Sequence, residues 1–595
     1  MTRPAFRLAL LGGLLLAAGL IGLPRSQPAQ GQAEPTPLPL YALPNATVDR
    51  AYTGGSLALL PDGRTLVVAN PLSNSVTITI PTQERVIAEV PVGREPRAVA
   101  ITPDGALALA ANRLDSTLSL IDLESAAVVA VIPLGGASPV QVVMGERGLA
   151  YVALRESNEV VEVDVAGRAV IRRIATAPAP SGLVLWGDFL YVTHFWPGTV
   201  SLIYLPQGNV VGQASLYPGA SLAAALAPDI SRGLAYAPFT ELRSHDPAPL
   251  YDSLALPAVA QLDLRALQAG SQPLPLDSLD RPVNLPLSAA LDRFRQLLYV
   301  ANFGSASITV LDLAGDTARA NIPVGSGPFG LALNPDYSLL YVHNLFDGTV
   351  STVNTQTFDV VRVQVVAPLG VPADVIIGAQ AFNGAADPRL TTLHGVSCAT
   401  CHFDGLSDGR VWQGINGGRN TPLLYGLADS APYLADGAWD DLADIELRIR
   451  ALQAGEGLIE ELEQADTAGI HAGLSDDLDA LTAWLLQLPA PVLPAAGTPE
   501  GRERGRAVFA EQGCETCHSG PAFTSQQLAD VGTGGAFDTP SLRWLALSAP
   551  YFHDGRAATL RTVFELPGAH QLITSVPAAD LDALLDYLLS LPEEG

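Results

Sequence analysis

The chain has 595 residues, too many for one ordinary domain and enough for two or three. Its basic residues, 33 in number, are all arginine, and with 60 acidic residues they give a net charge of −27 at pH 7. This balance excludes the basic face that nucleic-acid binding requires, and a hydrophobic content of 48% excludes long disordered tracts. We therefore predict no nucleic-acid partner.

The first 33 residues have the pattern of a secretory signal. Arg3 and Arg7 precede an apolar run over 8–23, and the small residues Gly31 and Ala33 offer a cleavage site. The run is short for a membrane span, so a retained N-terminal membrane anchor is the less favoured alternative. We expect a signal peptide over 1–33 and a mature protein that is secreted or periplasmic, and thus extracytoplasmic.

A repeat with a period near 42 residues follows. The segment "PDGRTLVVAN" at 61–70 recurs as "PDGALALAAN" at 103–112, and five further copies of the turn and apolar run end near 154, 194, 238, 302 and 344. Alternating runs such as "SITVLDL" at 307–313 close the units and indicate strands. Units of this length with several strands are typical of β-propeller blades. We predict an all-β seven-bladed propeller over 45–368, with a β-sandwich array or a solenoid as the alternative.

Two repeats resemble the YVTN-type propellers in sequence. The residues that carry this resemblance are "YVAN" at 299–302 and "YVHN" at 341–344. His194 and His343 end two of the strand runs, and we interpret both as ordinary loop residues. A propeller alone specifies no chemistry, although its axial funnel can bind a ligand or a partner.

All four cysteines lie in two copies of one motif, "CATCH" at 398–402 and "CETCH" at 514–518. C-x-x-C-H is the attachment sequence of c-type haem, because two thiols one helical turn apart can bond its vinyl groups and the adjoining histidine can bind its iron. The 112 residues between Cys401 and Cys514 exclude a single zinc site of ordinary spacing. We expect two covalently bound c-type haems, held by four cysteines and by two histidines as proximal iron ligands: Cys398, Cys401, Cys514, Cys517, His402 and His518.

Helix patterns flank each motif. A Gly-x-x-x-Phe spacing at 378–382 and at 505–509 resembles that of cytochrome c, which implies a first helix that packs on a last one. Apolar residues at helical spacing over 478–489 and 581–592 predict the two closing helices.

A second duplication lies between each motif and its closing helix. Residues 421–442 align without gaps to 539–560, at a constant offset of 118 and with 12 of 22 positions identical. The predicted fold class is thus multidomain, with the propeller followed by two mainly α cytochrome c-like domains, over 373–490 and 498–595.

The C-terminal region resembles the bacterial di-haem cytochrome c peroxidase/MauG family. "RNTP" at 419–422 and "APYFHDG" at 549–555 carry the resemblance, and fusion to a YVTN-like propeller is similar to a subset of that family. The resemblance implies a peroxidase-like oxidoreductase in which one haem relays electrons and the other reacts with peroxide or another small oxidant. It also implies a soluble or membrane-bound redox partner. The alternative is a non-enzymatic electron-transfer protein, with the propeller as its partner- or substrate-binding module.

The sixth ligand of each iron decides whether that iron relays electrons or reacts. Met1 and Met144 are the only methionines, and neither lies in a haem domain, so the methionine ligand common in the family has no counterpart here. His471 and His570 stand just before the two closing helices, in segments that differ by four residues in length. We predict these two as the distal ligands, with His553 as an alternative.

Overall fold

The computed structural model describes residues 52–592 except 54, 146, 246–253, 277–282, 393–394, 415–416, 461, 463–468 and 573. The predicted signal peptide over 1–33 lies outside the described residues, as do the first residues predicted for the propeller. All described residues belong to one structural unit, 42–595. None of the helices within them is long and apolar enough to cross a membrane.

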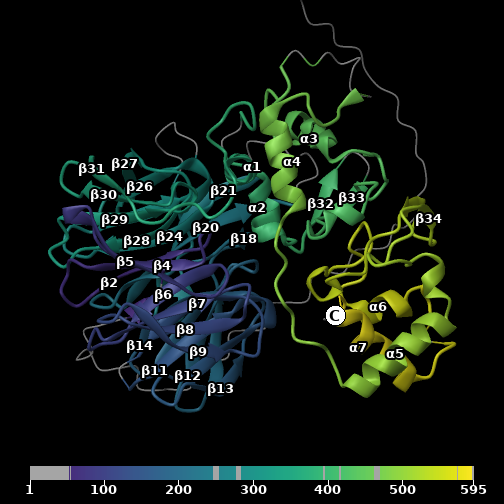
Figure 1. The fold of residues 1–595 in the computed structure, drawn as a ribbon, viewed down its shortest axis with the longest axis horizontal. Coiled ribbons are helices and arrows are strands. Elements are labelled where there is room, and N and C mark those ends of the chain that lie inside the picture. The colour runs from purple at the N-terminus through teal and green to yellow at the C-terminus, as the bar shows by residue number, and fades with distance from the viewer. Residues whose placement is uncertain are drawn as a thin grey trace, which may run out of the picture. The chain divides into compact units, whose positions relative to one another are not determined.

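Seven antiparallel sheets build a seven-bladed β-propeller, which confirms the fold predicted from the repeats (Figure 1). The first three blades are β2 (Leu57–Leu59), β3 (Leu66–Asn70), β4 (Ser75–Ile80) and β5 (Arg85–Pro91); β6 (Pro96–Ile101), β7 (Leu107–Asn112), β8 (Thr117–Asp122) and β9 (Ala127–Pro133); and β10 (Pro139–Met144), β11 (Leu149–Leu154), β12 (Glu159–Asp164) and β13 (Ala169–Ala175). The fourth and fifth are β14 (Pro180–Trp186), β15 (Phe189–His194), β16 (Thr199–Tyr204) and β17 (Asn209–Ser215); and β18 (Ala220–Ser221), β19 (Ala227–Asp229), β20 (Leu234–Leu242), β21 (Ala255–Asp263), β22 (Gln268–Ala269) and β23 (Leu274–Pro275). The last two are β24 (Pro286–Asp292), β25 (Leu297–Asn302), β26 (Ser307–Asp312) and β27 (Thr317–Pro323); and β28 (Pro328–Leu333), β29 (Leu339–Asn344), β30 (Thr349–Asn354) and β31 (Val360–Val365).

An asparagine at the end of the second strand explains part of the repeat. The Asn302 side chain donates hydrogen bonds of 3.1 and 2.9 Å to two hydroxyl groups of the next strand. The same pair of bonds recurs at three further asparagines, Asn70, Asn112 and Asn344. His194 takes this place in the fourth blade, where its Nε2 lies 2.8 Å from the Oγ of Ser201. His194 and His343 are both buried within strands, so their interpretation as loop residues is wrong.

The first and last blades close the ring by packing, without sharing a strand. Leu57 of the first blade and Tyr341 of the seventh belong to one buried apolar cluster. The Nδ1 of His343 also lies 2.9 Å from the Oγ of Ser56. Closure of the ring protects the faces of both terminal blades from water.

The chain itself enters the ring among the first strands of the blades, which pack on one another around the axis. The short strand β1 (Tyr52–Thr53) pairs antiparallel with β14 of the fourth blade. Gly55 bridges to Val99 in β6 of the second blade. The axial funnel therefore holds backbone of this chain.

Two helical domains follow the propeller (Figure 1). The first contains α1 (Ala373–Asn383), α2 (Cys398–His402), α3 (Ile445–Leu452), α4 (Asp476–Leu486) and the hairpin of β32 (Val411–Gly414) and β33 (Gly417–Asn420). The second contains α5 (Pro499–Glu511), α6 (Leu560–Glu565), α7 (Ala578–Leu589) and the hairpin of β34 (Leu528–Asp530) and β35 (Ala536–Asp538).

Both helical domains use the same helix crossing, of α1 on α4 and of α5 on α7. A Cβ atom at Gly378 would lie 2.0 Å from the carbonyl oxygen of Ala480, and one at Gly505 would lie 2.0 Å from that of Ala583. Only glycine allows the backbones to approach this closely. The crossings are those that the Gly-x-x-x-Phe spacing predicts.

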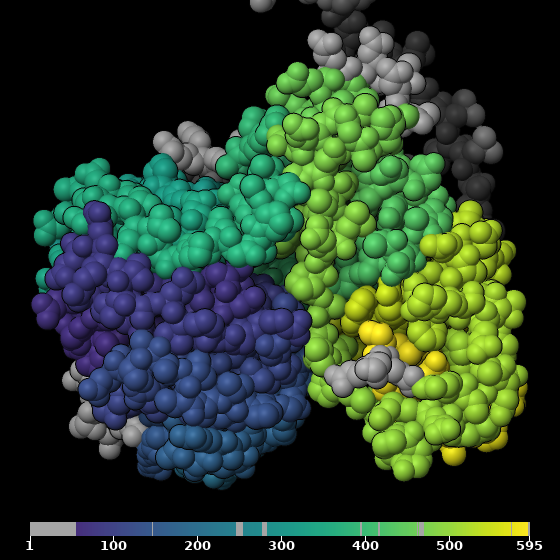
Figure 2. Space-filling view, in the orientation of Figure 1, coloured from purple at the N-terminus to yellow at the C-terminus, as the bar shows by residue number. Residues whose placement is uncertain are grey.

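The first helical domain rests on the propeller face formed by the turns after the second strands. The backbone N–H of Ala385 donates a 2.7 Å hydrogen bond to the carbonyl oxygen of Gly304, in the turn after β25. Figure 2 shows the teal last blades against the green segment that begins this domain. The domain therefore starts in contact with the sixth and seventh blades.

Candidate haem sites

The first motif forms the short helix α2, with both thiols half-buried and free of disulfides. The Sγ of Cys398 accepts a 3.3 Å hydrogen bond from the Nε2 of Gln453. Burial raises the pKa of Cys398 and, more strongly, that of Cys401. Both groups are therefore neutral thiols outside any disulfide, which leaves them available for thioether formation with a haem.

His402 ends this helix. Burial lowers its pKa to about 4, so the imidazole is neutral at pH 7, as a metal ligand must be. Its Nδ1 is buried and has no hydrogen-bond partner among the described residues. Cys398 packs on the same apolar cluster as Ala399, Leu481 and Leu485, which covers one side of this half-buried site.

The second motif begins with a 3-10 turn over Cys514–Thr516. Cys514 is half-buried against an apolar cluster, whereas Cys517 is exposed. The Nδ1 of His518 lies 3.1 Å from the carbonyl oxygen of Phe523, which can only accept a hydrogen bond. Nδ1 therefore carries the proton, and Nε2 keeps the lone pair that binds a metal.

His570 faces His518 across this second site. Their ring centroids are 6.4 Å apart, and their ring planes are inclined by 45°. Because a histidine nitrogen lies about 2 Å from a bound metal and about 1 Å from its ring centre, two rings on opposite sides of one iron have centres about 6 Å apart. Burial lowers the pKa of both histidines, and the Nδ1 of His570 is buried without a partner among the described residues. The pair fits a haem iron that is held from both sides.

His471 does not face the first motif in this way. It is exposed, and its Nδ1 donates a 2.8 Å hydrogen bond to the carbonyl oxygen of Ala472. In the part of the chain that the structure describes, no ring contact joins His471 to His402. The two predicted distal histidines are therefore in different settings.

His553, the alternative ligand, lies at the boundary of the two helical domains. Its ring stacks on Phe537 with centroids 3.8 Å apart. Its carbonyl oxygen accepts a 2.7 Å hydrogen bond from the backbone N–H of Asn420 in the first domain. These contacts give His553 a role in joining the domains.

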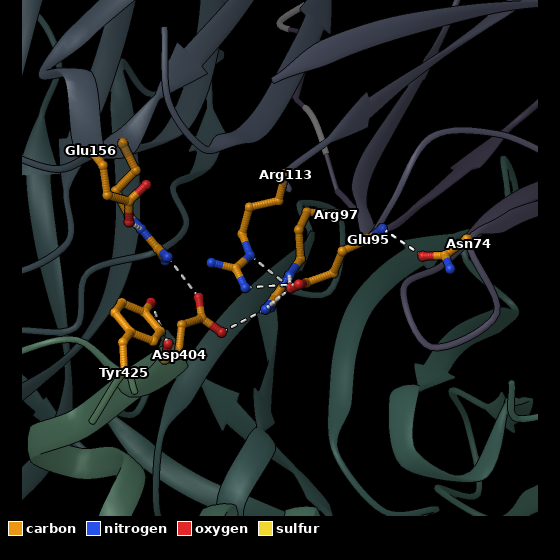
Figure 3. A network of polar contacts seen from close by, with 8 residues as sticks. Asn74, Glu95, Arg97, Arg113, Glu156, Asp404 and Tyr425 are labelled. Atoms are coloured by element: carbon orange, nitrogen blue, oxygen red, sulfur yellow. Dashed lines mark hydrogen bonds and ion pairs between the residues drawn. The ribbon is translucent and has the colours of Figure 1, made fainter. Parts of the chain in front are cut away.

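A buried ion network beside the first motif was not predicted from the sequence (Figure 3). The carboxylate of Asp404 accepts hydrogen bonds of 2.5 Å from Arg97 and 2.6 Å from Arg155, both in the propeller. Glu95 accepts 2.6 Å from Arg97 and 2.7 Å from Arg113. Burial alone would raise the pKa of Asp404, but the charges of the three arginines outweigh burial and hold this pKa far below its usual range.

The second helical domain reaches the same loop through an aromatic pair. The hydroxyl of Tyr425 donates a 2.7 Å hydrogen bond to the carbonyl oxygen of Asp404 (Figure 3). The Tyr425 ring packs edge-on against Trp544 of the second domain, with centroids 5.7 Å apart. The loop after the first motif is thus where all three domains meet.

Comparison with known proteins agrees with this arrangement. MauG of Methylorubrum extorquens is 28% identical over 244 residues, which cover 33% of this chain and 68% of that protein. Cytochrome c551 peroxidase of Pseudomonas aeruginosa is 26% identical over 262 residues, which cover 34% and 75%. This chain is a relative of MauG and the bacterial cytochrome c peroxidases. These relatives support haem cofactors, a di-haem redox role and an oxidoreductase of peroxidase type, as the sequence motifs predict.

Among solved structures, hydrazine synthase of Kuenenia stuttgartiensis aligns with this chain at a TM-score of 0.47 and 23% identity, over 50% of this chain and 94% of that one. No protein-family model matches the chain.

Proposed function

We propose that the protein is an extracytoplasmic di-haem c-type oxidoreductase with one six-coordinate and one open iron. Cys514 and Cys517 would hold the second haem through thioether bonds, and His518 and His570 would both bind its iron. Cys398 and Cys401 would hold the first haem, and His402 would bind its iron. Bound haem supplies one-electron transfer and, where a coordination position is open, reaction with an oxidant.

The observation that carries the proposal is the difference between the two sites. The 6.4 Å spacing of His518 and His570 supports two ligands on the second iron. The exposure of His471 supports a first site to which His471 supplies no ligand. We therefore assign electron entry to the second domain and reaction with peroxide, or another small oxidant, to the first.

The signal-like residues 1–33 and the haem-attachment motifs support maturation and work outside the cytoplasm, with electrons supplied by a soluble or membrane-bound redox partner. The propeller acts as a scaffold in this proposal, because β1 already pairs within its axial funnel.

The test is reoxidation of the fully reduced, haem-loaded protein by hydrogen peroxide. Two one-electron cofactors match the two electrons that convert one peroxide, with two protons, into two waters. We expect one peroxide to reoxidise one chain within seconds. Reduced protein that peroxide leaves unchanged would instead identify a pure electron-transfer protein.

A further inference from the structure

The propeller holds the first end of the CATCH helix through one buried side chain. Asn284, just before β24, donates hydrogen bonds of 3.1 Å to the Oγ1 of Thr400 and 2.9 Å to the carbonyl oxygen of Gly395. Its Oδ1 accepts a 3.0 Å hydrogen bond from the hydroxyl of Ser397. Asn284 is 1% exposed. Both polar atoms of its amide are hydrogen-bonded to residues at the start of this helix, and water does not compete for these bonds.

The propeller also holds the other end of the same helix. Asp404 follows His402 by two residues and binds Arg97 and Arg155, which come from the second and third blades (Figure 3). Phe403 lies between His402 and Asp404 in sequence and is 3% exposed. The centroid of its ring is 5.0 Å from that of Phe195 in the propeller. Phe403 and Asp404, the two residues after His402, are thus held by propeller side chains. We call these contacts, together with those of Asn284, the clamp.

The network is balanced in charge without further groups. Each arginine also has a glutamate partner in the propeller: Arg97 and Arg113 bind Glu95, and Arg155 binds Glu156. With Asp404 the cluster contains three carboxylates and three guanidinium groups. The propeller therefore keeps its own ion pairs when the Asp404 carboxylate is removed, and the cluster then carries one net positive charge.

The backbone at Asp404 has a conformation that glycine adopts more readily than aspartate. Asp404 has a φ of +58°, in the left-handed region that disfavours most side chains. The position two residues after the second motif is Gly520, with a φ of +69° and no atom within 4 Å of where a Cβ would be. Glycine makes the same turn without strain. The two domains therefore share this turn, but only the first has a carboxylate there that binds the propeller.

We propose that the propeller is the positioning element of the first haem site, acting on His402 through Asp404 and Asn284. This inference rests on the proposed function only in requiring that His402 binds a haem iron. The clamp fixes the loop that carries the proximal ligand, and its balanced charge sets the electrostatic potential at that iron. The second haem, whose motif has no such anchor in the described residues, is independent of it.

Two charge variants of the haem-loaded full chain test the proposal by spectroelectrochemistry. Asp404→Asn removes a negative charge and is expected to raise the reduction potential of one haem, because positive charge favours the reduced state. Arg155→Gln removes a positive charge on the far side of the same contact and is expected to lower the potential of that same haem. The other haem stays unchanged in both variants. Arg94→Gln, in an exposed ion pair with Asp115 of the second blade, is the control and is expected to shift neither potential.

Opposite shifts of the reduction potential indicate an electrostatic positioning role. If the two substitutions only loosened the structure around the haem, the potential would shift in the same direction in both variants. Unchanged potentials, shifts of equal sign, or shifts of both haems together would overturn the proposal. Asp404→Gly separates the anchor from the turn, since it relieves the strained φ and removes the carboxylate. Hydrogen exchange of the full chain should then show faster exchange over 398–406 and unchanged exchange over 514–520; equal protection of 398–406 in this variant would also overturn it.

A haem count by pyridine haemochrome keeps this test separate from the proposed function. If peroxide fails to react but two haems are present and the potentials shift in opposite directions, the proposed function fails and the clamp stands. If peroxide reacts and the potentials do not respond, the clamp fails alone.

Discussion

The two helical domains share a fold and differ at the positions around the iron. The second has a histidine pair at 6.4 Å and a glycine after its motif, whereas the first has an exposed His471 and an anchored Asp404. The tyrosine hydroxyl bonds inside each domain are nevertheless the same, from Tyr433 to Leu427 at 3.1 Å and from Tyr551 to Leu545 at 2.9 Å. The two domains thus share the same scaffold but differ in the candidate iron ligands and in the contacts that hold the residues after the motif.

Removing the attachment thiols should give the largest effect. Cys398→Ser with Cys401→Ser is expected to lower the haem count from two to one per chain and to abolish the reaction with peroxide, because the open iron is lost. The matched change of Cys514 and Cys517 should also leave one haem, but one that still binds cyanide. Pyridine haemochrome assays and cyanide titration measure both, and a reactive protein after loss of the first pair would reverse the assignment of roles.

Removing one distal ligand should change the second site alone. In His570→Ala we expect the second iron to lose its sixth ligand, so that cyanide binding rises from one to two per chain. His471→Ala, at the equivalent exposed position, serves as control and should leave the number at one. A second cyanide site that opens with His471→Ala would contradict the difference between the two domains.

The shared helix crossing should respond equally in both domains. Gly378→Ala and Gly505→Ala each place a methyl group 2.0 Å from a carbonyl oxygen, which forces the helices apart at a cost of about 1–3 kcal/mol or more. Differential scanning calorimetry should show a lower unfolding temperature in each variant. An unfolding temperature that falls in only one of the two variants would show that the helix crossings of the two domains are not equivalent.

Acid should weaken the propeller and therefore the support of the first domain. Burial lowers the pKa of His343 to about 4, so between pH 6.5 and 4 the unfolded chain binds a proton that the folded chain does not. The contribution of His343 to stability is complete above pH 6.5 and is lost as the pH falls, by about 2 kcal/mol at pH 5. Urea unfolding at pH 7 and pH 5 should show this loss, and His343→Gln should reduce it. An equal loss in the variant would assign the effect to other groups.

Features with a short period or a fixed spacing could be predicted from the sequence. Such features depend on residues that are near in sequence, so the sequence alone displays them. They include the 42-residue repeat, the closing helices and the glycines at 378 and 505. The place of His570 just before a closing helix predicts a distal ligand there, and this stays a prediction that the 6.4 Å spacing from His518 supports. The local patterns account for the fold.

Features that depend on distant pairing could not be predicted. Asp404 and Arg97 are 307 residues apart in sequence, and nothing local to either one indicates the other. One difference between the motifs pointed to a special role of Asp404: the second motif has a glycine, Gly520, at the equivalent position. Position relative to the closing helix does not by itself identify a ligand, because the segments before the two helices differ in length and His471 lies exposed whereas His570 faces His518.

Electron paramagnetic resonance of the oxidised, haem-loaded protein tests the central asymmetry most directly. The account predicts one low-spin signal from the second iron and one high-spin signal from the first, with only the high-spin signal converted by cyanide. The low-spin signal should persist in His471→Ala and disappear in His570→Ala. Two low-spin signals that cyanide does not change, or a low-spin signal that survives loss of His570, would contradict it.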